Sequence, residues 1–330
     1  MANLTLSIAV GDYDRNRALF NGNVNIDGVN PVYMRLSPEE IFFRAFRSQD
    51  FDVCELSLSS YTVGAANNTN KYIAIPAFLS RSFRHSSIYI RKGCGIEKPE
   101  DLRGKRIGVA EYQLTANVWA RAILEDEYAV KPSEIFWIRG GVETPSRPEK
   151  IKLQLPSDIL IEPAPAGKTL DEMLVNGEIH GFVGPRNPPS FDSKNPNIVR
   201  LFPDLVGTAS DYYRRTGIFP IMHLLGLRKT LADEHPWLPA ALFKAFNASK
   251  NLAIQSLLDT AAPHATIPFL SEHIESAQEL MGVDYWSYGL SGNQHILKYF
   301  LEHHHRQGLS SRLLEVEELF HPGALEQFSV

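Results

Sequence analysis

The sequence has few cysteines, no excess of positive charge and no long hydrophobic run. Its only two cysteines, Cys54 and Cys94, cannot build the disulfide framework of a small secreted domain. The 33 Lys and Arg residues against 38 Asp and Glu residues give a net charge of −5, which argues against a nucleic-acid partner. The longest apolar stretch, residues 218–227, is interrupted by Pro220 and His223. It is far shorter than the roughly 20 apolar residues of a membrane span, so we expect no membrane partner.

The first ten residues lack the features of a signal peptide. They contain no basic segment, no apolar run of sufficient length and no small-residue cleavage site. Leu4, Leu6, Ile8 and Val10 alternate with other residues, which is typical of a strand. We therefore expect a cytoplasmic protein whose two cysteines are free thiols in a reducing compartment.

Several common motifs are also missing. The sequence contains no GxGxxG, GxxxxGK[ST], HExxH, GxSxG or CxxC pattern, so nucleotide-binding, zinc-protease and serine-hydrolase interpretations have no support. His303, His304 and His305 are consecutive, and on a helix they would point in different directions, whereas a metal pair needs spacing i, i+4. The sequence predicts neither a metal site nor a cofactor.

What is present is a regular alternation of strands and helices. A length of 330 residues favours two domains. Helices are expected to begin near Pro38, Thr115, Leu170, Pro236 and Ser291. The expected strands cover residues 4–10, 29–36, 51–56, 72–78, 87–91, 106–110, 135–138, 180–183 and 218–227. This order predicts an α/β protein with mainly parallel sheets flanked by helices.

Ligands of such sheets bind outside the carboxyl ends of the strands, and the loops expected there are rich in arginine. The guanidinium of an arginine binds a carboxylate through two parallel hydrogen bonds. The helix that begins at Thr115 would add the positive end of its dipole. A small dicarboxylate or similar anion is the predicted ligand, although a single loop arginine is more often a solvated surface group. The candidate binding residues are Asp12, Arg15, Ser57, Ser59, Arg84, Tyr112, Gln113, Thr115, Arg139 and Arg186.

Three further residues are candidates for proton transfer. Glu55 lies in an otherwise apolar strand, and glutamate is rarely buried without a partner. His85 and His223 border apolar stretches, and histidine titrates closest to neutral pH. For each histidine, a satisfied position in the core is an equally good interpretation.

The domain plan resembles the type II periplasmic-binding-protein fold. The resemblance is carried by residues 98–109 (KPEDLRGKRIGV), 173–182 (MLVNGEIHGF) and 235–238 (HPWL). It implies two discontinuous lobes, one made of residues 1–90 and 220–330 and the other of residues 91–219. The chain would cross between them near residues 89–93 and 216–220, and a ligand would bind in the cleft between the lobes.

A finer resemblance is to the 4,5-dihydroxyphthalate decarboxylase family, whose members are cytoplasmic enzymes of phthalate breakdown. It is carried by residues 11–15 (GDYDR), 36–46 (LSPEEIFFRAF), 54–61 (CELSLSSY), 82–91 (SFRHSSIYIR), 111–119 (EYQLTANVW), 139–141 (RGG) and 220–223 (PIMH). The resemblance implies a lyase that removes one carboxylate from a hydroxylated aromatic dicarboxylate without oxidation, giving 3,4-dihydroxybenzoate and CO2.

The chemistry of this reaction suggests roles for the candidates. Deprotonating a phenol para to the departing carboxylate moves electron density to the carboxyl-bearing carbon, which can then be protonated before CO2 leaves. We expect His223 and His85 to transfer these protons, with Glu55 tuning a histidine or acting as the acid. The arginines would hold the carboxylates, and Asp12 would accept from a ring hydroxyl.

Other functions remain open at this stage. The main alternative is a cytoplasmic or leaderless solute-binding protein for an aromatic acid, without catalysis. An enzyme of pyrimidine or menaquinone precursor synthesis and a ligand-sensing module are further alternatives. The C-terminal segment, with Phe300, Phe320 and Phe328, leaves room for a dimer contact, so both a monomer and a homo-oligomer stay open.

Overall fold

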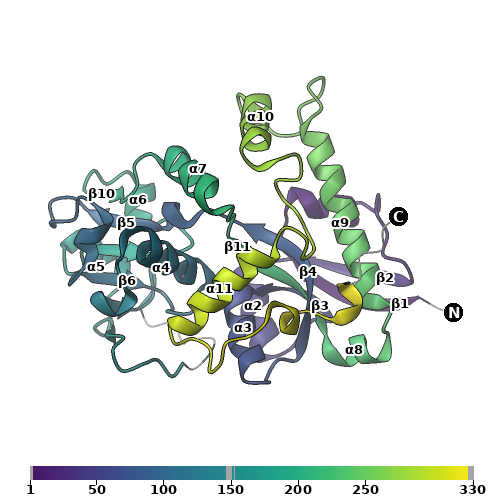
Figure 1. Cartoon of the computed structure of the whole chain (residues 1–330), viewed down its shortest axis with the longest axis horizontal. Helices are drawn as coiled ribbons and strands as arrows, with labels where there is room; N and C mark the ends of the chain where they lie inside the picture. Colours follow the sequence, from purple (N-terminus) through teal and green to yellow (C-terminus); the bar gives the residue numbers. More distant parts are fainter. Residues whose placement is uncertain (1–2, 146–150, 152, 326–330) are drawn as a thin grey trace. The chain divides into compact units, whose positions relative to one another are not determined.

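The computed structural model describes residues 3–145, 151 and 153–325. The chain divides into two compact units, and Figure 1 labels their helices and strands. Unit 1 comprises residues 1–81, 221–298 and 314–330, and unit 2 comprises residues 82–220 and 299–313. Phe328, which was considered for a dimer contact, lies outside the described residues.

Unit 1 is built on a five-stranded sheet with the order β2-β1-β3-β11-β4. Its strands are β1 (Leu4–Val10), β2 (Val29–Arg35), β3 (Val53–Ser57), β4 (Tyr72–Arg81) and β11 (Ile221–Arg228). β1 is parallel to β2 and β3, whereas β11 is antiparallel to both β3 and β4. The sheet is therefore mainly parallel, as predicted, with one reversed strand that the chain reaches on returning from unit 2.

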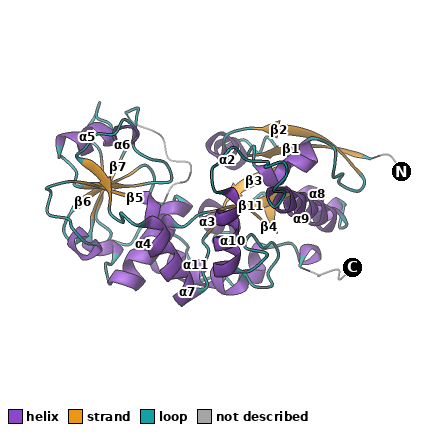
Figure 2. Ribbon diagram, turned by 90° about the horizontal axis from the view of Figure 1, so that it is seen from above, coloured by secondary structure: helices purple, strands orange, loops and turns teal. Residues whose placement is uncertain are grey.

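Helices cover both faces of this sheet. α2 (Pro38–Arg47) and α3 (Leu58–Ala66) lie on one side, and α8 (Lys229–Glu234) and α9 (Leu238–Leu257) lie on the other (Figure 2). α2 begins at Pro38 as predicted, and Ser37 caps it, since its side chain accepts from the Glu40 N–H. The remaining elements of the unit are η1 (Asp14–Asn16), α1 (Arg17–Phe20), α10 (Leu270–Met281), η5 (Val316–Leu319), η6 (Pro322–Ala324) and the beginning of α11 (Gln294–Arg306).

Unit 2 is built on a six-stranded sheet with the order β10-β5-β9-β6-β7-β8. Its strands are β5 (Ile88–Arg91), β6 (Arg106–Val109), β7 (Phe136–Arg139), β8 (Ile161–Pro163), β9 (Gly181–Val183) and β10 (Ile198–Arg200). β9, β6, β7 and β8 are parallel, whereas β5 is antiparallel to β9 and β10. Both sheets are thus mixed, with one reversed strand each where the pattern predicted parallel neighbours.

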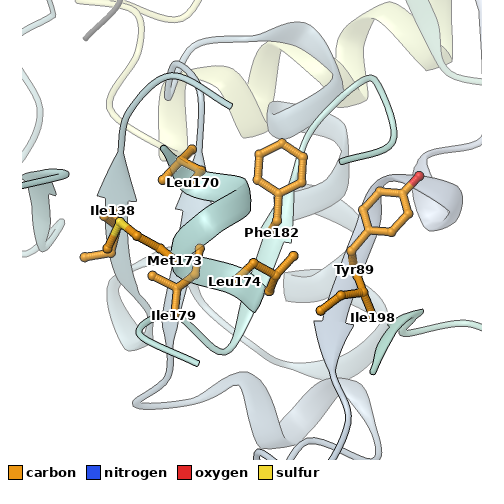
Figure 3. Close-up of a cluster of buried hydrophobic side chains, with 8 residues drawn as sticks. All are labelled: Tyr89, Ile138, Leu170, Met173, Leu174, Ile179, Phe182 and Ile198. Atoms are coloured by element: carbon orange, nitrogen blue, oxygen red, sulfur yellow. The ribbon is translucent and has the colours of Figure 1, made fainter. Parts of the chain in front are cut away.

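The helices of unit 2 are α4 (Thr115–Tyr128), α5 (Leu170–Asn176), α6 (Pro189–Asp192) and α7 (Leu205–Thr216), with short 3-10 turns η2 (Arg84–Ser87), η3 (Pro99–Leu102) and η4 (Pro132–Glu134). α5 begins at a capping box between Thr169 and Glu172 and ends at Gly177 in the left-handed conformation. Its apolar side packs on the sheet in a cluster of buried side chains (Figure 3): Tyr89, Ile138, Leu170, Met173, Leu174, Ile179, Phe182 and Ile198.

Two boundaries differ from the predicted lobes. β5 pairs with β9 and β10, so residues 82–90 belong to unit 2, and the chain enters unit 2 after Arg81. Residues 299–313 also belong to unit 2, because Tyr299 and Phe300 pack against Trp119 of α4. Local periodicity does not reveal such partners, which come from elements far away in the sequence.

Phe300 and Phe320 do not provide the exposed surface that a dimer contact through them would need. Both rings are buried inside a unit, Phe300 against Trp119 in unit 2 and Phe320 against Phe78 in unit 1. Their hydrophobic surface is already used in the two cores. No helix of the described residues is long and apolar enough to cross a membrane.

Candidate functional site

In unit 1, three strands bring their polar ends to one edge of the sheet. β1 and β3 end at this edge, and the antiparallel strand β11 begins there. His223 is opposite Ser57, and Leu225 is opposite Glu55, so Glu55 and His223 are diagonal neighbours on the same face. Glu55 lies within β3 and His223 within β11, in agreement with the strands expected at residues 51–56 and 218–227. His223 reaches the edge because its strand is reversed.

Glu55 is the centre of this cluster. Its side chain is fully buried, and Oε1 accepts a hydrogen bond from His223 Nδ1 at 2.6 Å and from the Tyr13 hydroxyl at 2.7 Å. Oε2 accepts from the backbone N–H of Gly11 at 2.9 Å. A buried carboxylate is costly unless it is paired and hydrogen-bonded, and here both oxygens are satisfied.

These contacts determine the charge state of Glu55. Burial alone would raise the pKa of its carboxyl, but the hydrogen bond and charge of His223, together with the Tyr13 and Gly11 hydrogen bonds, hold the pKa below its usual value. Glu55 is therefore a carboxylate that can only accept hydrogen bonds. It follows that His223 Nδ1 carries a proton, which leaves Nε2 as the nitrogen able to exchange a proton with a ligand.

The His223 ring is also held from the side. Phe42 of α2 contacts it edge-on, with ring centroids 4.8 Å apart. The side chain of His223 keeps 16% of its surface exposed, whereas that of Glu55 has none. The imidazole is thus fixed by an aromatic ring and a carboxylate while part of it stays accessible.

The register of β11 with β4 is irregular beside this histidine. His223 is opposite Ser80, but Leu225 is opposite Ile75, so the pairing shifts on both sides of His223. Such bulges bend a strand and are common next to active sites, where they redirect a side chain.

Arg15 occupies a different environment from the one predicted for a carboxylate ligand. Its Nε donates to the Leu79 carbonyl at 2.7 Å, and its Nη2 donates to the same oxygen. The guanidinium lies over the rings of Tyr13 and Trp286, with 4.0 and 4.4 Å to the ring centroids. Arg15 therefore stabilises the loop that carries Tyr13, and its role toward a substrate stays a prediction.

The other candidates of unit 1 belong to the ends of β1 and β3 or to the residues that follow them. Ser57 is the last residue of β3 and is buried, and Asp12 is exposed in the turn after β1. Ser59 is buried in the first turn of α3. α3 begins directly after β3, so Ser57 and Ser59 lie on either side of this junction.

In unit 2, a second group of candidates gathers at the carboxyl edge of the parallel strands. Val109 of β6 is aligned with Arg139 of β7 and with Val183 of β9. The loops after these strands therefore start at one edge. They carry Tyr112 and Gln113 before α4, Thr115 at its first position, Arg139 itself, and the exposed Arg186.

Tyr112 and Gln113 are fully buried. The Tyr112 ring lies under the Arg121 guanidinium at 3.7 Å, and Gln113 Nε2 donates to Glu111 Oε2 at 2.7 Å. Both side chains thus contribute to the packing of the segment before α4.

Arg84 and His85 share the turn η2, which packs against α4 and α7. Burial lowers the pKa of Arg84 to about 10. Burial, with a smaller effect of the Arg215 charge, lowers the pKa of His85 to about 4. The imidazole of His85 contacts Phe202 and Tyr212 edge-on and is neutral at pH 7. The structure thus brings Glu55 and His223 together in unit 1 and places His85 in unit 2.

Tyr13 is the residue of this cluster that the list of candidates omitted. It lies in the segment 11–15 on which the family resemblance rests, but a tyrosine in a turn shows no pattern that predicts a carboxylate partner. No group of three or more His, Cys, Asp or Glu side chains among residues 3–145, 151 and 153–325 is arranged to hold a metal ion.

The two mixed sheets and the returning strand β11 define a fold class. The chain has the fold of the periplasmic binding proteins: it matches a periplasmic sulfonate-binding protein from Methylobacillus flagellatus with a TM-score of 0.57 and 11% identity over 98% of this chain and 94% of the other. The predicted fold is therefore confirmed.

The particular family follows from closer relatives. The chain is 56% identical over 330 residues, all of both chains, to the 4,5-dihydroxyphthalate decarboxylase of Comamonas testosteroni. It is also 56% identical over 214 residues to the enzyme of that name from Pseudomonas putida, covering 65% of this chain and 83% of the other. No family model matches. The chain belongs to the 4,5-dihydroxyphthalate decarboxylase family, which confirms the resemblance found in the sequence.

Proposed function

We propose that this chain converts 4,5-dihydroxyphthalate into 3,4-dihydroxybenzoate and CO2, with His223 and Glu55 as its acid–base pair. The full-length relationship to a decarboxylase of this name supports the reaction. The observation that supports the roles is the 2.6 Å contact between His223 Nδ1 and Glu55 Oε1, since a carboxylate that orients a histidine leaves its other nitrogen ready for proton transfer.

The proposed steps begin at the phenol. His223 Nε2 takes the proton of the hydroxyl para to the departing carboxylate, and Glu55 stabilises the imidazolium that forms. The phenolate electrons move through the ring to the carboxyl-bearing carbon, which accepts a proton from the imidazolium or from water. The bond to the carboxylate then breaks, CO2 leaves, and its bonding electrons restore the aromatic ring and return the negative charge to the phenolate oxygen, which takes up a proton from solvent. One proton is consumed in total, because a carboxylate departs as neutral CO2.

The remaining candidates keep their predicted roles within this proposal. Arg84, Arg139 and Arg186 would hold the substrate carboxylates through charge-assisted hydrogen bonds, and Tyr112, Gln113 and Thr115 would complete the binding. His85 is the second proton-transfer candidate, although its burial in unit 2 disfavours its charged form. No cofactor enters these steps, and the cytoplasm remains the predicted location.

The direct test is turnover in D2O. The protein is incubated with 4,5-dihydroxyphthalate, CO2 is measured, and the product is examined by NMR. We expect 3,4-dihydroxybenzoate with one deuterium at the carbon that lost the carboxylate. His223→Gln should abolish most of this turnover, whereas His273→Gln, which changes an exposed histidine of α10, should not. Binding of the substrate without release of CO2 would instead support the solute-binding alternative.

A further inference from the structure

We propose that Tyr13 is a positioning residue for the acid–base pair, because its hydroxyl donates to the same Glu55 oxygen that His223 contacts. The two donors approach Oε1 at 2.7 Å and 2.6 Å. The inference rests on the proposed function, in which His223 acts through its free nitrogen. In this arrangement Tyr13 fixes the orientation of the carboxylate and disperses part of its charge.

The hydroxyl of Tyr13 acts here as a donor and not as a second acid. Burial, followed by the nearby charge of Glu55, raises the pKa of Tyr13 far above its usual value, so the phenol keeps its proton at neutral pH. A carboxylate cannot donate, so the proton in this contact belongs to Tyr13.

Three neighbours hold the Tyr13 ring in place. A Cβ on Gly11 would lie 2.7 Å from ring atoms of Tyr13, so glycine is needed for the ring to pack over the backbone. The Arg15 guanidinium lies over the ring at 4.0 Å, and Trp286 packs on that guanidinium at 4.4 Å. Trp286 is tied to β4 through its Nε1, which donates to the Phe78 carbonyl at 3.0 Å. The ring position therefore depends on the protein alone and precedes substrate binding.

The placement has a consequence for the His223 proton. Glu55 on β3 is the charged group that His223 contacts directly, and Phe42 on α2 is uncharged. Tyr13, whose ring lies under the Arg15 guanidinium, donates to the same oxygen of the carboxylate. Removing the Tyr13 hydroxyl concentrates the negative charge of Glu55 on its contact with His223. The imidazolium is then favoured, so His223 should release its proton only at higher pH.

The experiment compares Tyr13→Phe with a matched control. Phenylalanine keeps the ring between Gly11 and Arg15 and removes only the hydroxyl. The control is Tyr72→Phe, which removes a buried hydroxyl that donates to the Phe51 carbonyl at 2.8 Å. Tyr72 pairs with Arg228, at the opposite end of β11 from His223. Both variants remove a buried hydroxyl together with its hydrogen bonds, which for Tyr13 include Ser80 and for Tyr72 include Cys54. Only Tyr13→Phe removes a contact with the Glu55 carboxylate.

We expect Tyr13→Phe to lower kcat by about tenfold, in line with the loss of a hydrogen bond to a charged group, with little change in KM. In a plot of kcat against pH, the rise of kcat on the acid side (the acid limb) should move to higher pH, because His223 must be neutral to act as the base. Tyr72→Phe should leave both the profile and kcat unchanged. Replacing Tyr13 by 3-fluorotyrosine, a stronger donor that keeps the contact, should preserve kcat and shift the limb to lower pH.

A measurement without turnover separates this inference from the proposed function. The titration of the His223 ring is followed by NMR, with its signal assigned from its loss in His223→Gln. A midpoint that rises in Tyr13→Phe supports the positioning role even in a protein that does not decarboxylate 4,5-dihydroxyphthalate. An active wild type, with an unchanged midpoint and kcat in Tyr13→Phe, would overturn the inference and leave the proposed function standing.

Discussion

The two units each contain a histidine in the neighbourhood predicted for chemistry, but in opposite surroundings. His223 of unit 1 is partly exposed and contacts a buried carboxylate at 2.6 Å. His85 of unit 2 is 1% exposed, contacts Phe202 and Tyr212, and has an Nδ1 without a hydrogen-bond partner among the described residues. A carboxylate stabilises the imidazolium, whereas aromatic burial disfavours it. Both histidines border apolar stretches of the sequence, but their surroundings in the fold give them different acid–base properties.

The two units also contain a buried glutamate each. Glu55 of unit 1 contacts His223 and Tyr13, whereas Glu111 of unit 2 accepts from the Gln113 amide. One carboxylate is linked to a group that can exchange protons near neutral pH, and the other is linked to an amide. The comparison predicts that only the first is needed for the chemical step.

The largest effect on kcat is expected when the two buried glutamates are replaced one at a time. Glu55→Gln should lower kcat by about 10²–10⁴-fold, the range typical of lost acid–base catalysis, because an amide cannot stabilise the His223 imidazolium. Glu111→Gln should lower kcat by less than about tenfold, since the amide can keep the hydrogen bond to Gln113. Steady-state kinetics with 4,5-dihydroxyphthalate measures both. Equal losses in the two variants, at equal unfolding free energies, would contradict the assignment of the site to unit 1.

A smaller effect on kcat is expected at Gly11, where the cluster around Glu55 leaves no space for a side chain. The Cβ of Gly11→Ala would lie 2.7 Å from the Tyr13 ring and should displace the hydroxyl from Glu55, lowering kcat by roughly tenfold. The double variant Gly11→Ala/Tyr13→Phe should lose less than the sum of the two single losses, because both changes act on one contact. Additive losses would show that Gly11 acts by another route.

Much of the unit 1 fold follows from local patterns in the sequence. The alternation of Leu4–Val10 and the Ser37 cap predict elements that the structure contains, because periodicity and capping are local properties. Glu55 was recognised from a local conflict, namely a charged residue in an apolar strand. A group of this kind requires a partner, and the structure provides one.

Long-range partners could not be predicted in the same way. His223 is 168 positions from Glu55, and their contact depends on the reversal of β11, which no hydrophobic period encodes. The burial of Phe300 and Phe320 was not foreseen for the same reason, since both pack against distant residues. Tyr13 was missed because its chemistry arises only from its contact with Glu55.

Arg139 of unit 2 and Arg15 of unit 1 are expected to contribute to different properties, one to substrate binding and the other to stability. Arg139→Met should raise KM for 4,5-dihydroxyphthalate by about tenfold, the effect of a lost hydrogen bond to a carboxylate, with kcat little changed. Arg15→Met should mainly lower the free energy of unfolding, because it removes the contacts with the Leu79 carbonyl, Tyr13 and Trp286. Kinetics and denaturant unfolding of both variants measure these effects. A larger rise of KM in Arg15→Met than in Arg139→Met would assign carboxylate binding to unit 1.

The smallest effect on kcat is expected at His85, whose main contribution should be to the dependence of stability on pH. Its pKa in the folded protein is about 4, below its ordinary value of 6.5, so between these values the unfolded chain binds more protons than the folded one. The free energy of unfolding should therefore fall as the pH drops from about 6.5 to 4, by about 2–3 kcal/mol from this residue. In His85→Phe, which keeps an aromatic ring beside Phe202 and Tyr212, this acid-dependent loss should be smaller than in the wild type.

Denaturant unfolding at pH 7, 5.5 and 4 measures this difference, and kcat at pH 7 completes the comparison. A residue that is neutral and buried should be replaced with little loss of kcat, whereas His223→Gln should lose most of the activity. If His85→Phe were as inactive as His223→Gln while keeping wild-type stability at every pH, His85 would transfer protons despite its burial. The catalytic apparatus would then include a residue of unit 2, and the contrast between the two histidines would no longer hold.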